Sequence, residues 1–134
     1  ALDLQGPPGV PILPVQPPQA GVASRGGSQW LPWRNGFLSV VHQVLPGDQR
    51  LYIHRFIWVS LDFQRSLVSY PFVFQAAGVE YCCGLAKGFA PGQFWLSYGR
   101  DDREAWVAEM SEQEIFQLFQ NAPSENSSIE RGLE

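Results

Sequence analysis

Two apolar runs of the sequence end abruptly on polar side chains, which filling a core does not require. LSVVHQV leads to His42, and WLSYGRDD leads to Arg100, Asp101 and Asp102. An imidazole can donate a hydrogen bond to a phosphate or sugar oxygen, and its charge is tunable near neutral pH. A carboxylate can accept hydrogen bonds from two hydroxyl groups, which suits the vicinal diol of a sugar. His42 and Asp102 are therefore candidate binding residues. The alternative is that these groups are paired and solvated within ordinary turns.

Two further polar residues are candidates for the same site. Arg25, in RGGS, offers a guanidinium to an anion such as phosphate or a sugar carboxylate, and the glycines after it allow close backbone approach. Glu80 stands just before the apolar run YCCGLA and is a candidate polar contact to a sugar. The alternative for Arg25 is an ordinary surface arginine. Glu80 and Asp102 can also be interpreted as the two carboxyl groups of a glycosidase.

The composition restricts the classes of partner. The chain has 134 residues, 45% of them hydrophobic, which is enough for one modest core. A formal charge of -4 argues against a nucleic-acid groove, and a single lysine, Lys87, argues against a polybasic membrane patch. The apolar runs are too short to span a bilayer, and the start ALDLQGPP lacks the features of a secretory signal. We therefore expect a cytoplasmic protein without a nucleic-acid or membrane partner.

The two cysteines, Cys82 and Cys83, are adjacent. In a strand their side chains point to opposite faces, so a disulfide between them would be strained. Without a CxxC motif or a neighbouring histidine they do not indicate a zinc site. We expect two small strand residues in a reducing compartment, and no visible motif requires a metal.

The chain divides into three parts by composition. Residues 1–24 form a Pro-rich segment, which predicts an extended linker because proline neither continues a helix nor pairs in a central strand. Residues 25–120 alternate apolar runs with turn residues, and residues 121–134 form a polar tail.

Seven strands and one helix are predicted in the middle part. Four strands form one antiparallel sheet: SQWLPW, FLSVVHQV, LYIHRFIWVSLD and LVSYPFVF. The pair Asn35-Gly36 predicts a tight hairpin turn, and Pro71 places the fourth strand at an edge. YCCGLAKG, FWLSYG and EAWVAEM are three more strands. SEQEIFQLFQ is the helix, which Ser111 and Glu114 begin with a capping box.

Aromatic side chains within the strands are expected mainly in the core. His54 is interpreted as a hydrogen-bonded core histidine. Three tryptophans inside apolar strands are also assigned to the core: Trp58, Trp95 and Trp106. Trp30 and Trp33 are alternative stacking surfaces for a pyranose ring.

These elements predict an all-β fold of antiparallel sheets with one short C-terminal helix. A four-stranded unit followed by three strands at similar spacing is typical of β-propeller blades. A seven-stranded β-sandwich has much the same periodicity, so the pattern alone leaves both open.

The order of the motifs favours the propeller. GFLSVVHQ, LYIHRFIWVSLDF, GVEYCCGLA and FWLSYGRDDREAWVAEMSEQEIFQLF together resemble the C-terminal half of the five-bladed propellers related to glycoside hydrolase family 130. That family comprises mannoside phosphorylases and hydrolases. The sequence looks closer still to an uncharacterised bacterial branch, whose members can be attached to glycosyltransferase domains. The resemblance implies a partial propeller with blades at 25–75 and 78–110 and a helix at 111–120.

The resemblance also implies roles for individual residues. His42 matches the position that binds phosphate in the phosphorylases of the family, in the strand end that reads YHG there. Asp102 matches the aspartate that contacts sugar hydroxyls, in a turn that reads YGAAD there. The general-acid aspartate and the phosphate-binding arginines of the family would lie in earlier blades, so we expect the chain not to be catalytic by itself.

The resemblance therefore implies a domain that binds a mannoside-like carbohydrate or a sugar phosphate at the channel mouth, where His42 and Asp102 are expected to meet. No cofactor is expected, although inorganic phosphate is a candidate co-substrate of a longer parent protein. Exposed sheet edges would favour self-association or pairing with missing blades. The alternative from another class is a non-catalytic structural or protein-interaction module, such as an accessory domain of a glycosyltransferase.

Overall fold

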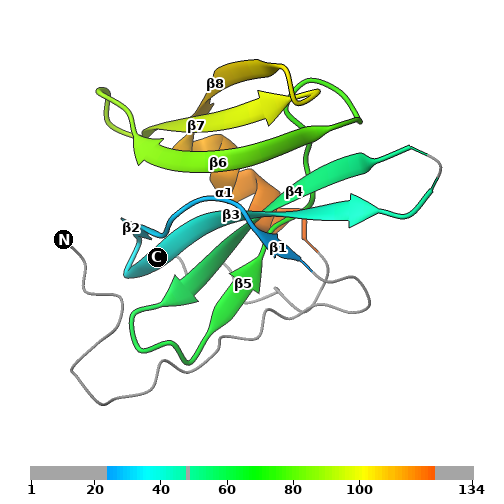
Figure 1. Ribbon diagram of the computed structural model, residues 1–134. Helices are drawn as coiled ribbons and strands as arrows, with labels where there is room; N and C mark the ends of the chain where they lie inside the picture. Colours follow the sequence, from blue (N-terminus) through cyan, green and yellow to red (C-terminus); the bar gives the residue numbers. More distant parts are fainter. Residues whose placement is uncertain (1–23, 48, 123–134) are drawn as a thin grey trace, which may run out of the picture.

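The computed structural model describes residues 24–47 and 49–122, which form two antiparallel sheets and one helix (Figure 1). The predicted all-β class with a short C-terminal helix is confirmed. The predicted linker and tail lie outside the described residues, apart from Ser24, Asn121 and Ala122. Within the described ranges, no helix combines the length and the apolar composition that a membrane crossing requires.

The first sheet is a meander, in which strands that follow one another in sequence lie side by side. Its strands are β1 Arg25–Gly26, β2 Leu31–Trp33, β3 Gly36–Leu45, β4 Leu51–Ser60 and β5 Ser66–Val68. β1 and β2 pair with the same edge of β3, which pairs with β4, and β5 ends the sheet. The sequence-based prediction lacks β1, because two residues are too few to show a strand period.

A two-residue loop joins β2 to β3. Arg34 and Asn35 both have left-handed backbone conformations, with φ of 46° and 58°, and Trp33 pairs with Gly36. Left-handed residues at both loop positions suit the twist of a hairpin. The turn therefore lies one residue earlier than the Asn35-Gly36 pair predicts. Gly36 instead begins β3, where a Cβ atom would clash with the carbonyl oxygen of Val59 and the indole of Trp58.

The second sheet is also a meander, and the helix follows it directly. The elements are β6 Glu80–Lys87, β7 Gln93–Arg100, β8 Glu104–Ser111 and α1 Glu112–Gln120. The hydroxyl of Ser111 accepts a hydrogen bond from the backbone N–H of Glu114 at 3.1 Å, as the capping pattern predicts. Cys82 is buried and Cys83 is exposed, so the two adjacent thiols do point to opposite faces.

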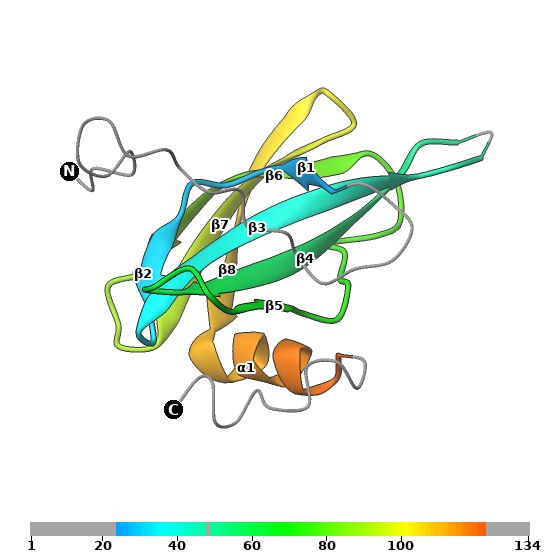
Figure 2. The ribbon, with the colours of Figure 1, turned by 90° about the horizontal axis from the view of Figure 1, so that it is seen from below.

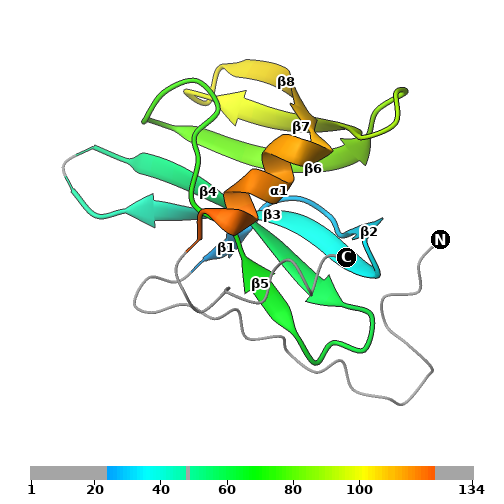
Figure 3. The same ribbon diagram turned by 180° about the vertical axis from the view of Figure 1, so that it is seen from behind.

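Both sheets and the helix share one core. The sheets face each other, and α1 lies along one side of them (Figures 2 and 3). Trp33 of β2 stacks on Phe119 of α1 with ring centroids 6.3 Å apart, and it meets Phe94 of β7 edge-on at 6.2 Å. The helix therefore packs against the core and covers one side of it.

The tryptophans differ in how deeply they are buried. Trp58 is fully buried, which confirms its assignment to the core, and Trp95 is partly buried. Trp33 is also a core residue, so it does not offer its ring to a ligand. The assignment of Trp106 to the core is wrong, because its side chain is 47% exposed on β8, the last strand of the second sheet. β8 is an edge strand, so its side chains have a neighbouring strand on one side only.

The propeller arrangement stays a prediction. Both sheets are meanders, which is the connectivity of propeller blades, and they lie within the predicted blade ranges 25–75 and, except for the last residue of β8, 78–110. Two facing meanders also make a small sandwich, so connectivity does not separate the two architectures.

Candidate functional site

Arg25 and His42 lie next to each other, although 17 positions separate them in the sequence. β1 pairs with β3 so that Arg25 is directly opposite His42, and β4 places His54 on the other side of His42. The ring of His42 stacks on Tyr52, with centroids 5.5 Å apart. Burial and, to a smaller extent, the positive charge of Arg25 lower the pKa of His42, so this imidazole is neutral at pH 7.

His54 is the buried neighbour of this group, as its interpretation as a core histidine predicts. It has no exposed surface, and its Nε2 accepts a hydrogen bond from the backbone N–H of Cys82 at 3.1 Å. That bond places the proton of the neutral ring on Nδ1. Burial, followed by the charge of His42, lowers the pKa of His54 to about 4, although the Phe72 carbonyl acts in the opposite direction. The Nδ1 atoms of both histidines are buried without a hydrogen-bond partner in the described part of the chain.

Asp102 lies in the turn between β7 and β8. Asp101 and Asp102 both have left-handed backbone conformations, with φ of 55° and 53°, and Arg103 N–H donates to the Arg100 carbonyl at 3.1 Å. Aspartate tolerates this conformation better than most residues, so the backbone alone accounts for two aspartates here. Asp102 also forms an exposed ion pair with Arg50 at 3.3 Å, which is worth little by itself.

Glu80 has a clear structural role. It is 1% exposed, and its carboxylate accepts hydrogen bonds from the backbone N–H groups of Phe74 at 2.9 Å, Gln75 at 3.0 Å and Ala76 at 3.4 Å. The carboxylate therefore fixes the loop that leads from β5 to β6. A sugar hydroxyl would have to replace one of these amides, so the contact predicted for Glu80 stays a prediction that this geometry does not favour.

Glu80→Gln is expected to lower the free energy of unfolding by about 1–3 kcal/mol, because an amide group would face backbone donors and leave one of them unpaired. Urea denaturation measures the loss, and amide hydrogen exchange should accelerate at Phe74 to Ala76. Glu109→Gln is the matched control, since Glu109 is exposed on β8 and should change stability little. Equal losses in the two variants would contradict the role of Glu80.

A series of contacts links the four predicted site residues. Arg50 directly precedes β4 and carries the ion pair to Asp102, while Tyr52 of β4 donates its N–H to the Gly78 carbonyl at 2.8 Å. Asp101 N–H donates to the carbonyl of Val79, the residue before Glu80, also at 2.8 Å. The polar ends of the two apolar runs therefore lie at the same end of the two sheets. His42 and Asp102 are joined indirectly, through Arg50 and β4.

Tyr52 and Arg50 are parts of this region that the motif analysis misses. The signal that could have found them is the register of the β3–β4 hairpin, in which Leu45 pairs with Leu51, Val44 with Tyr52 and His42 with His54. Counting back from the turn LPGDQR places Tyr52 on the same face as His42.

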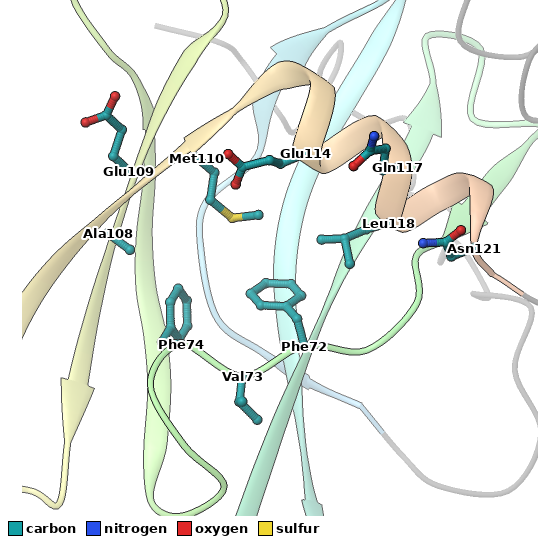
Figure 4. Close-up of a pocket in the computed structure, with 10 residues that line it drawn as sticks. All are labelled: Phe72, Val73, Phe74, Ala108, Glu109, Met110, Glu114, Gln117, Leu118 and Asn121. Atoms are coloured by element: carbon teal, nitrogen blue, oxygen red, sulfur yellow. The ribbon is translucent and has the colours of Figure 1, made fainter.

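A cavity of about 430 Å³ lies elsewhere, between β8, α1 and the segment after β5 (Figure 4). Its ten described lining residues are Phe72, Val73, Phe74, Ala108, Glu109, Met110, Glu114, Gln117, Leu118 and Asn121. None of the four predicted site residues is among them. In residues 24–47 and 49–122, no three His, Cys, Asp or Glu side chains are grouped as a metal site.

No family model, curated protein or solved structure matches this chain. The resemblance to glycoside hydrolase family 130 rests on the sequence motifs alone and stays a prediction. The ligand of the chain, its localisation and any detail of its fold beyond the all-β class stay predictions.

Proposed function

We propose that the chain is a carbohydrate-binding domain that takes a saccharide or sugar phosphate where Arg25 lies opposite His42. The observation that supports this proposal is their pairing across β1 and β3, which sets an exposed cation beside a neutral imidazole. A guanidinium attracts phosphate with charge-assisted hydrogen bonds, and a neutral imidazole offers a hydrogen bond to a sugar or phosphate oxygen.

Two neighbouring groups fit the same ligand class. The phenol ring of Tyr52, stacked on His42, provides an apolar surface for a pyranose ring. Asp102 can accept hydrogen bonds from sugar hydroxyls if the ligand displaces Arg50, and this exchange costs little because the ion pair is exposed. The motif resemblance points to a mannoside, and the general acid of the family that the motifs resemble would lie in earlier blades. The proposal is therefore binding in the cytoplasm, without catalysis by this chain alone.

The test is a titration with methyl α-mannoside, mannose 1-phosphate and inorganic phosphate, followed by NMR. Bound phosphate should raise the pKa of His42, because its negative charge opposes the effect of Arg25. Arg25→Ala should weaken the two phosphate ligands by about 10-fold or more, the usual loss for a charge-assisted hydrogen bond. Asp102→Asn should weaken the mannoside more than inorganic phosphate.

Arg65→Ala is the matched control, because Arg65 lies over the ring of Trp58, at the other end of β4. Its affinities should stay within twofold of the unchanged protein. Absence of binding at tens of millimolar, or binding that His42→Ala, Arg25→Ala and Asp102→Asn all leave intact, would overturn the proposal.

A second candidate function is a protein-interaction module. The observation that favours it is β8, an edge strand that exposes Trp106 and Val107 by 47% and 66%. Exposed apolar side chains on an open edge are a common feature of interaction surfaces.

A further inference from the structure

β8 presents an open backbone edge. It pairs along its whole length with β7, and in the described ranges no strand pairs with its other side. Its sequence EAWVAEMS has neither proline nor lysine, the residues that commonly block an open edge. The eight residues of β8 can therefore accept one more strand.

The inner face of β8 is apolar but only partly covered. Trp106, Ala108 and Met110 pair with Tyr98, Leu96 and Phe94 of β7, three buried residues that face the core. Alternation gives the three β8 side chains the same direction. Ala108 and Met110 of β8 and Leu118 of α1 line the cavity of about 430 Å³ (Figure 4).

Phe72 and Phe74 close the opposite wall of the cavity, as Figure 4 shows. Apolar side chains of β8, of α1 and of the segment after β5 thus line the cavity. A cavity beside an open edge is the arrangement that binds extended peptides, because main-chain hydrogen bonds supply affinity and a pocket selects alternate side chains.

The charge around the edge is acidic. Glu114 points toward Met110 from the helix, and Glu109 lies on the other face of β8 (Figure 4). None of the ten described lining residues is basic. A second copy of the chain, with its own net charge of -4, would bring the same carboxylates together, whereas a basic segment would complement them.

We propose that β8 and this cavity bind an extended peptide of another protein in which apolar and basic residues alternate. The peptide pairs with the free edge of β8, its apolar side chains continue the row of Trp106, Ala108 and Met110, and its Lys or Arg side chains meet Glu109. This inference rests on the interaction module, the second candidate function, and is independent of the saccharide site. Loss of sugar binding in His42→Ala would therefore leave it unaffected.

The experiment uses the chain of 134 residues and a fluorescent eight-residue peptide of alternating valine and lysine. We expect micromolar binding by fluorescence anisotropy, weaker by 10-fold or more in Glu109→Lys. The corresponding valine–glutamate peptide should not bind. Alternate backbone nitrogens of the peptide can be methylated in two ways. One of the two resulting peptides should not bind, because its methyl groups replace the N–H groups that donate hydrogen bonds to the edge of β8.

Two controls separate peptide binding from charge attraction and from misfolding. Asp62→Lys changes an exposed carboxylate in the turn between β4 and β5, and should alter the affinity by less than twofold. Circular dichroism checks that each variant is folded. Trp106→Ala changes an exposed side chain, so it should weaken binding of the peptide without unfolding the chain.

Three results would overturn the proposal. One is an affinity that falls equally for Asp62→Lys and Glu109→Lys, which would indicate charge attraction alone. Another is a dimer in sedimentation that Trp106→Ala dissociates, which would assign the edge to a second copy. The third is full protection of the outward amides of β8 from hydrogen exchange in the free chain, which would show that the edge is already covered.

Discussion

Trp58→Ala is expected to lower the free energy of unfolding by about 3–5 kcal/mol, the usual cost of removing a buried aromatic side chain. Trp58 is fully buried in the shared core, and its indole N–H donates to the Trp33 carbonyl at 3.1 Å. The guanidinium of Arg65 lies 5.5 Å from the ring centroid. The substitution leaves a cavity and a buried carbonyl without its partner, in a domain whose total stability is of the same order as the loss.

Urea denaturation followed by circular dichroism measures this loss. The matched control is Trp106→Ala, which removes the same side chain from an exposed position and should cost less than about 1 kcal/mol. Trp58→Phe should fall between the two, because it keeps most of the buried ring but not the N–H donor. Similar losses of unfolding free energy in Trp58→Ala and Trp106→Ala would contradict the burial of Trp58 in the core and the exposure of Trp106.

The sequence predicts the elements well because their signals are local. Apolar runs mark β3, β4, β6, β7 and β8, and turn residues separate them. The helix is predicted together with its beginning, because Ser111 and Glu114 form a pattern that acts within one turn. These signals act between neighbours in the chain, and they do not depend on how the sheets pack.

The errors concern contacts between layers. Alternation tells that Trp106 shares a face with Met110, but it does not tell where the opposite sheet ends. The structural role of Glu80 also depends on contacts that the sequence does not reveal, because the amides that hold its carboxylate belong to a loop that has no regular pattern. One part of the candidate site could be predicted from the sequence and another could not. His54 follows from its strand, whereas the approach of Arg25 to His42 needs a two-residue strand that no period reveals.

The chain is expected to lose stability as the pH falls from about 6.5 to about 4, by roughly 3 kcal/mol from His54 alone. The buried ring has its pKa lowered to about 4, whereas an unfolded chain binds the proton near 6.5. Between these values the unfolded state carries more protons than the folded state. The stabilising effect is therefore complete above pH 6.5 and decreases as acid is added.

Two measurements check this prediction. NMR titration of the folded chain should give a pKa near 4 for the His54 ring, and urea denaturation at pH 7 and pH 4.5 should show the loss of stability. His54→Gln keeps an acceptor for Cys82 N–H without a titrating ring, so its stability should depend less on pH even if it is lower at pH 7. The pKa of His42 is also lowered, so His42 adds a loss of the same sign, and His42→Gln should keep most of the pH dependence.

A pKa of 6.5 for His54 in the folded chain would contradict the burial of this ring between the two sheets. It would mean that water reaches the ring and that the hydrogen bond from Cys82 to Nε2 does not form. The same bond connects β4 of the first sheet to β6 of the second. The titration therefore tests the packing of the two sheets at the end where the proposed ligand binds, independently of any ligand.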